Sequence, residues 1–178
     1  MYHSVLGKSA VGASFESMTT YKHYTKKITL AAEGLLASVH AHVYGTALNA
    51  ENIRFGLWAD ASGSPRELVG LGAHVQGGAG LYLQNTSSDG LPRWLRVGFG
   101  CWLPAGDYWI GVMSGGSSLH LAYDGSGHDK VWTGTIDDLT DGGTVFAITD
   151  SGNDYSIRAD VLVPNKQPAA QTGDSSSF

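Results

Sequence analysis

The chain has very little cysteine and few charged residues. Cys101 is its only cysteine, and 15% of its 178 residues are Asp, Glu, Lys or Arg. A single cysteine excludes a disulfide framework within the chain. So little charge is untypical of a solvated helical protein, whose outer faces need polar and charged side chains. With 25 glycines and 42% hydrophobic residues, the composition favours an all-β domain with many turns, or a subunit that covers much of its surface in an assembly.

The sequence also lacks a basic stripe, a signal sequence and a long apolar run. The formal net charge is -5, and the only basic cluster is formed by Lys22, Lys26 and Lys27. Nucleic-acid-binding proteins usually carry a basic stripe, so no nucleic-acid partner is expected. The N-terminal residues contain no apolar core of signal-peptide length, and no segment approaches a membrane span. We therefore expect a protein that is made in the cytosol and has no membrane partner.

The clearest pattern lies in residues 93–112, which predict two strands joined by a turn at residues 104–106. One face of the first strand is apolar and is expected to point to a core: Leu95, Val97, Phe99, Cys101 and Leu103. The other face carries Trp94, Arg96 and Trp102. Alternation with period 2 is typical of a half-buried strand. Two tryptophans and an arginine on the outward face indicate a surface that meets a sugar ring, a nucleobase or another protein.

Similar alternation recurs along the chain. Residues 35–44 place apolar side chains on one face, namely Leu35, Ala37, Val39, Ala41 and Val43, and place His40, His42 and Tyr44 on the other. Residues 53–60 point Trp58 away from the core, and Trp109 falls opposite its apolar neighbours. We count roughly eight to ten short strands separated by turn sequences and no amphipathic helix of three turns. The pattern predicts an antiparallel β-sandwich of jelly-roll type.

The length suits a single domain with a sizeable core. We assign the β-sandwich to residues 25–164. Residues 1–24 show no sustained periodicity and are expected to form an N-terminal arm, or a loop over a sheet edge. Residues 165–178 are polar and predict a C-terminal tail that a neighbouring subunit holds.

No catalytic or cofactor site stands out. His40 and His42 lie two residues apart on one strand face, so a third ligand from another strand would complete a metal site. His74, His120 and Asp60 are the candidates for that ligand, but no spacing rule places them together. A polar outer face that tolerates histidine is the preferred interpretation. We predict no metal and no cofactor.

The carboxylates form two runs, at residues 137–141 and 150–154. Asp137, Asp138 and Asp141 belong to the first run, and Asp150 and Asp154 to the second. Residues 141–143 (DGG) and 150–153 (DSGN) are good turn sequences, so both runs predict turns rather than the paired carboxylates of a glycosidase. Calcium in one of these loops is a weaker alternative, because the register of an EF-hand is missing. The chain is therefore predicted not to be an enzyme.

The outward-facing residues are the candidate binding residues: Trp58, Trp94, Arg96, Trp102, Trp109, His40, His42 and Tyr44. Coplanar aromatic rings on a sheet form a platform for pyranose rings. Tryptophan, tyrosine and arginine are also the residues that anchor subunit interfaces, and an outward tryptophan can simply lie under a loop of its own chain. We rank a subunit interface or loop cover above the sugar platform.

Residues 103–112 (LPAGDYWIGV) and residues 53–65 (IRFGLWADASGSP) carry a family resemblance. They resemble the β-sandwich of jelly-roll type in tailed-bacteriophage structural proteins and in carbohydrate-binding-module-like domains of bacterial surface proteins. The resemblance spans residues 27–123 and includes no catalytic signature. It implies a virion protein, either a capsid decoration or fibre-like protein or a tail or baseplate component. Such a protein would form homo-oligomers and pack its aromatic anchors and terminal arms against copies of itself and other virion proteins. The alternative is a carbohydrate-binding module that attaches a virion to host glycans.

Overall fold

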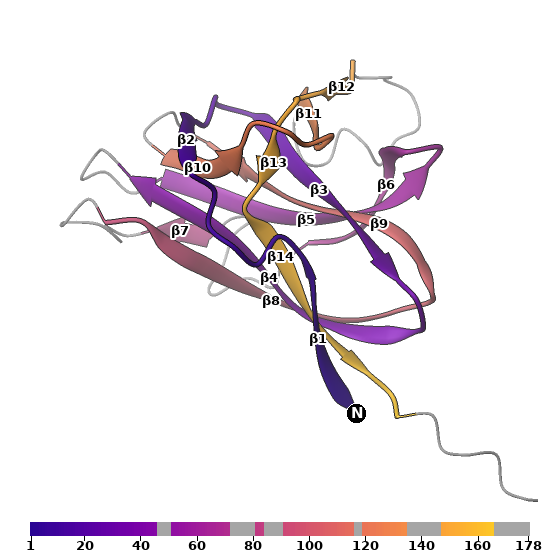
Figure 1. The fold of residues 1–178 in the computed structure, drawn as a ribbon. Helices are drawn as coiled ribbons and strands as arrows, with labels where there is room; N and C mark the ends of the chain where they lie inside the picture. Colours follow the sequence, from indigo (N-terminus) through magenta and orange to yellow (C-terminus); the bar gives the residue numbers. More distant parts are fainter. Residues whose placement is uncertain (46–50, 72–80, 84–90, 116–118, 135–146, 166–178) are drawn as a thin grey trace, which may run out of the picture.

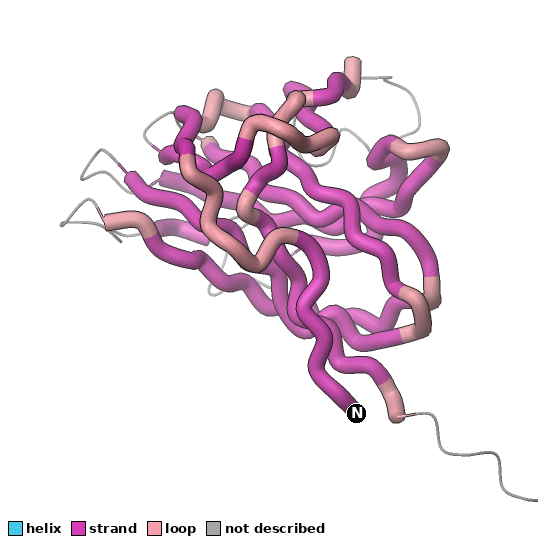
Figure 2. Tube along the Cα trace, in the orientation of Figure 1, coloured by secondary structure: helices cyan, strands magenta, loops and turns pink. Residues whose placement is uncertain are grey.

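Two antiparallel sheets packed face to face make up the protein (Figures 1 and 2). The computed structural model describes residues 1–45, 51–71, 81–83, 91–115, 119–134 and 147–165. These residues form strands, turns and loops, so the predicted all-β sandwich is confirmed. No helix in these ranges is long and apolar enough to cross a membrane.

Each sheet has seven strands in the described part of the chain. The first sheet has the order β1 (Tyr2–Gly7), β14 (Ile157–Val163), β4 (Gly34–Gly45), β10 (Leu119–Asp124) and β13 (Asp154–Tyr155), with β8 (Arg93–Leu103) paired to β4 and β2 (Ser14–Ser17) paired to β10. The second sheet has the order β12 (Thr149–Asp150), β11 (Lys130–Thr133), β3 (Lys22–Leu30), β9 (Gly106–Ser114), β5 (Glu51–Ala61) and β6 (Ser64–Leu71), with β7 (Leu81–Leu83) paired to β5.

Residues 1–24 belong to the sandwich and do not form the separate arm that the sequence predicted. β1 pairs with β14 along its whole length, and β2 pairs with β10. Met18 is fully buried in the core, and β3 already begins at Lys22. The two strands are short and mix polar with apolar residues, which is why periodicity did not reveal them. Of the predicted tail, Asn165 is exposed, and residues 166–178 lie outside the described residues.

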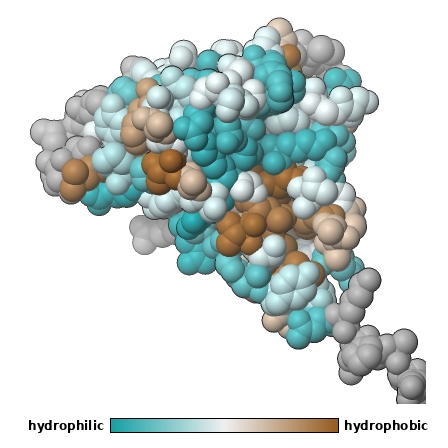
Figure 3. All heavy atoms as spheres, in the orientation of Figure 1, coloured by the Kyte–Doolittle hydropathy of each residue, from teal (hydrophilic) through white to brown (hydrophobic). Residues whose placement is uncertain are grey.

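The core lies between the two sheets and includes apolar residues from β5, β8, β9, β10 and β14. Its largest cluster includes Ile53, Phe55, Leu57, Leu95, Val97, Leu103, Tyr108, Ile110, Val112, Leu119, Leu121, Ile157, Ala159 and Val161. Phe99 and Cys101 are partly buried and pack against it. At one end of the sandwich, beside β1, Figure 3 shows a gathering of apolar residues, where a groove is lined by Tyr2, Leu6, Leu30, Val161 and Val163.

A β-bulge in β4 reverses the predicted facing of the first part of that strand. The second part behaves as predicted, with Val39, Ala41 and Val43 buried in the core. Before Ser38, however, the register with β14 shifts, and the buried core residue is Leu36. The extra residue, Ala37, places Leu35 opposite the exposed Trp102 of β8 and therefore on the outer face.

The second sheet buries apolar residues on its outer face as well. Trp58, Trp109, Met113 and Trp132 form a separate cluster there, with Leu68 and Ile148 packed against it. Trp58 and Trp109 do point away from the main core, as predicted, but their exposed fractions are 0% and 2%. They are covered by side chains of their own chain. The prediction that these two tryptophans are surface anchors is therefore wrong, and cover within the chain accounts for them.

Two glycines provide the space that Trp58 occupies. Gly56 on β5 and Gly111 on β9 are cross-strand partners. A Cβ atom on Gly56 would collide with the indole ring of Trp58. A Cβ atom on Gly111 would lie 2.5 Å from Cγ2 of Thr25 and 2.7 Å from the carbonyl oxygen of Tyr24, which is backbone and cannot move aside. The absence of side chains at this pair is what lets an indole ring lie flat on the sheet.

We expect Gly111→Ala to destabilise the protein by about 1–3 kcal/mol, the usual effect of overpacking a dense interior. The matched control is Gly98→Ala, because the nearest atom to a Cβ there is the carbonyl oxygen of Ala37 at 3.9 Å. Urea denaturation followed by tryptophan fluorescence measures both variants. Equal stabilities of the two variants would contradict this account of the glycine pair.

Candidate binding face on the first sheet

The outer face of the first sheet brings together six of the eight predicted binding residues. β4 supplies His40, His42 and Tyr44, and β8 supplies Trp94, Arg96 and Trp102. His40 and His42 are buried, with exposed fractions of 7% and 8%, so the prediction that they are surface binding residues is wrong. The register places His42 directly opposite Trp94, and His40 directly opposite Arg96. Directly opposed residues share one face of a sheet, so these side chains form a single patch. We call this patch the Trp94–Arg96 face.

Aromatic rings pack against one another at one end of this face. Tyr44 stacks on His120 of β10, with ring centroids 4.5 Å apart. Phe15 of β2 meets Tyr44 edge-on at 4.9 Å, and His42 meets Trp94 edge-on at 5.2 Å. Sequence reasoning missed Phe15, because residues 1–24 were expected to form an arm. The rings hold each other in fixed positions.

Arg158 of β14 covers one face of the Trp94 ring. Its guanidinium carbon lies 4.5 Å from the ring centroid, which is a cation–π contact. The register places Arg158 opposite His40 on the side of β4 away from Arg96. Ile157 and Ala159 on either side of it enter the core, so Arg158 points outward, but no sequence pattern indicates that it meets Trp94. Trp94 is therefore not an open platform.

A polar network occupies the middle of the face. Nε2 of His40 lies 2.8 Å from Oδ2 of Asp160 and 3.0 Å from Oγ of Ser38. Arg96 donates from Nε to the same Ser38 oxygen at 3.1 Å. Burial lowers the pKa of His40; Asp160 opposes that effect, and the charges of Arg158 and Arg96 add to it. Burial alone would raise the pKa of Asp160, but the hydrogen bonds and charge of His40 hold that pKa below its usual value.

Trp102 marks the apolar end of the face. Its exposed fraction is 54%, the largest of any described tryptophan. The register places it opposite Leu35, which lies opposite Leu162 of β14 on its other side. The bulge in β4 creates this end, because it turns Leu35 outward. The face thus runs from packed aromatic rings, through arginine and histidine, to an exposed tryptophan.

The remaining predicted residues are elsewhere. Trp58 is enclosed on the second sheet, and Trp109 donates from Nε1 to Oδ1 of Asp60 at 2.6 Å on that sheet. His40 and His42 share a face as predicted, and His120 stands near them, whereas His74 lies outside the described residues. The described residues contain no group of three His, Cys, Asp or Glu side chains arranged to hold a metal ion.

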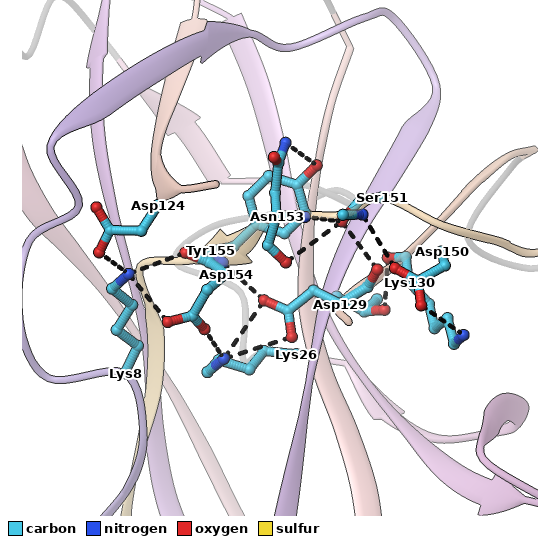
Figure 4. Close-up of polar contacts among 12 residues, drawn as sticks. Lys8, Lys26, Asp124, Asp129, Lys130, Asp150, Ser151, Asn153, Asp154 and Tyr155 are labelled. Atoms are coloured by element: carbon cyan, nitrogen blue, oxygen red, sulfur yellow. Dashed lines mark hydrogen bonds and ion pairs between the residues drawn. The ribbon is translucent and has the colours of Figure 1, made fainter. Parts of the chain in front are cut away.

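The second carboxylate run forms a turn, as predicted. Gly152 has a φ of 69° and donates from its backbone nitrogen to Oδ1 of Asp150 at 3.0 Å. Asp154, on β13, forms an ion pair with Lys8 at 3.0 Å and a second one with Lys26 of β3 (Figure 4). Because β13 and β3 belong to different sheets, the Lys26–Asp154 pair joins the two sheets. The first run, with Asp137, Asp138 and Asp141, lies outside the described residues.

Asp129 lies beside this ion pair and is 5% exposed. Its Oδ2 accepts a hydrogen bond of 2.6 Å from the backbone nitrogen of Tyr155, and its Oδ1 lies 3.4 Å from Nζ of Lys26. Burial raises the pKa of Asp129 to about 6, although Lys26 and the Tyr155 N–H favour the ionised form. The folded chain therefore holds a proton on Asp129 at a higher pH than the unfolded chain does.

The raised pKa of Asp129 makes the stability of the protein depend on pH. Between the unfolded pKa and about pH 6, folding takes up a proton on Asp129, so this residue contributes more stability as the pH falls. We expect Asp129→Asn to lose more free energy of unfolding than the wild type between about pH 7.5 and about pH 4.5, measured by urea denaturation. The control is Asp150→Asn: the backbone N–H of Gly152 lowers the pKa of Asp150, so that variant should lose less. If the free energy of unfolding changed equally with pH in the wild type and in Asp129→Asn, the raised pKa of Asp129 would be contradicted.

No protein-family model matches the chain, and no curated protein matches its sequence at a significant level.

Proposed function

We propose that this protein is a non-enzymatic structural component of a tailed-bacteriophage virion that packs its Trp94–Arg96 face and Trp102 against a neighbouring subunit. The observation that carries the proposal is the 54% exposed Trp102 at the end of a face that also holds Trp94, Tyr44 and Arg96. Tryptophan, tyrosine and arginine dominate the binding energy of protein interfaces. Burial of this face against another protein would account for all of these side chains together.

The placement in a virion comes from the resemblance of residues 53–65 and 103–112. In the fold, the first string covers most of β5 and the turn into β6, and the second covers the turn before β9 and most of β9. Both sequences form part of the framework of the second sheet, and they lie outside the Trp94–Arg96 face. They support a capsid decoration or fibre-like protein, or a tail or baseplate component. Residues 1–24 have no part in docking as a free arm, because they are strands of the sandwich.

The energy available from one anchor is appreciable. Complete burial of a large aromatic side chain contributes roughly 2–3 kcal/mol, and Trp102 has about half of its surface left to bury. A contact of that size is weak when single. Repeated by symmetry over many subunits of a particle, it becomes strong. Modest anchors on each copy therefore suit a component of a large assembly.

A glycan-binding module is the second candidate, favoured by the exposed ring of Trp102. A sugar platform needs two or three coplanar rings with open faces. Trp58 and Trp109 are buried, and Arg158 covers one face of Trp94. These facts reduce the platform to a single open tryptophan, so we rank packing against protein first.

We expect the full chain to form an oligomer by light scattering, and Trp102→Ala to lower its average mass at equal concentration. Tyr21→Ala is the matched control, because Tyr21 is also 54% exposed but lies between β2 and β3. That variant should keep the wild-type mass. A wild type that stays monomeric at every concentration would contradict self-assembly.

A glycan array with the same three proteins tests the second candidate. Glycan binding by the wild type that Trp102→Ala abolishes, with the mass unchanged, would favour the carbohydrate-binding module. The absence of glycan binding together with a loss of mass would favour the structural component.

A further inference from the structure

Two arginines of the Trp94–Arg96 face have no carboxylate partner in the described part of the chain. Arg96 and Arg158 lie on either side of His40, and the described residues place no Asp or Glu within ion-pair distance of either guanidinium. The lysines of the ionic cluster behave differently: Lys8, Lys26, Lys27 and Lys130 each contact an aspartate. Among the residues that the structure describes, the clustered lysines are therefore neutralised and the arginine pair is not.

Both arginines are nevertheless held in place. Arg96 donates from Nε to Oγ of Ser38 at 3.1 Å, although its side chain is exposed. Arg158 is fixed over the ring of Trp94. A guanidinium group that is already oriented loses less conformational entropy when a ligand binds. The pair is preorganised for a carboxylate, which a guanidinium binds through two parallel hydrogen bonds.

The charges beside the pair leave a positive excess there. Of the outward-facing histidines, His40 and His42 do not add to it, because burial lowers the pKa of each. The carboxylates on the same side of the described sheet are Asp160 and, at the ends of β10 and β13, Asp124 and Asp154. His40 and His3 contact Asp160, and Lys8 contacts Asp124. Beside the arginine pair, two guanidinium groups stand against the single carboxylate of Asp160, so the excess charge at this place is positive, in a chain whose formal net charge is -5.

We propose that Arg96 and Arg158 bind carboxylate side chains of an acidic segment in a protein partner, with Trp102 supplying apolar contact. This rests on the proposed function, because it names the chemistry of the neighbour that covers the face. Leu35 and Leu162 beside Trp102 suit a polypeptide, which offers apolar and acidic side chains together. Electrostatic attraction would also select this face over the acidic remainder of the surface.

The test uses a fluorescein-labelled octaglutamate peptide and the full chain, with binding followed by fluorescence anisotropy at about 50 mM and about 300 mM NaCl. We expect the wild type to bind at low salt and to release the peptide at high salt. Arg96→Gln should weaken binding about tenfold, the effect of losing one charge-assisted contact. Lys27→Gln is the matched control, since it removes the same charge from the second sheet, where Lys27 contacts Asp60 and Asp107. It should bind as the wild type does.

Three results would overturn the inference. The wild type does not bind the peptide; Arg96→Gln and Lys27→Gln weaken binding equally; or a sialylated glycan binds this face and octaglutamate does not. Light scattering separates this inference from the proposed function. An oligomer whose mass is unchanged in Arg96→Gln, without peptide binding, leaves the proposed function standing and removes only the acidic partner. A monomer that binds the peptide through Arg96 removes self-assembly and keeps the acidic partner.

Discussion

The two-residue period of β4 is the constraint on which both the core and the binding face depend. Val39, Ala41 and Val43 enter the core between the sheets, so His40, His42 and Tyr44 must point the other way. Strands β8 and β14 lie on either side of β4, and their registers place Trp94, Arg96 and Arg158 beside those residues. The face therefore needs no loop to position it. It is the reverse side of the packing that stabilises the fold, and that makes it rigid.

At one end of the sandwich, ion pairs and an aromatic contact connect the two sheets. Lys26 of the second sheet pairs with Asp154 of the first, and close by Tyr24 meets Tyr155 edge-on with ring centroids 5.4 Å apart. Asp129, buried next to them, has its charge opposed by burial and favoured by Lys26. An end built this way binds the sheets together through directional contacts, whereas the interior relies on apolar packing. Lys8 adds the segment after β1 to the same network.

The sequence predicted whatever depends on local alternation. It predicted the sandwich, both faces of β8, the turn at residues 150–154, and six residues that do share one face. It failed where the outcome depends on contacts between distant segments. The bulge at Ala37 reverses the facing of Leu35 and follows from pairing with β14, and the burial of Trp58 needs the cross-strand glycines Gly56 and Gly111. Alternation says which way a side chain points, but not whether something covers it.

The five tryptophans of the chain form two groups that differ in their exposure to solvent and hence in their fluorescence. Trp58, Trp109 and Trp132 are enclosed on the second sheet, whereas Trp94 and Trp102 stand on the first sheet within reach of solvent. A water-soluble quencher should reach only the outer pair while the chain is folded. A partner that covers the outer pair would shift its emission and leave the inner group unchanged, whereas unfolding would shift all five. The intrinsic tryptophan fluorescence of the native chain can therefore distinguish the binding of a partner from unfolding.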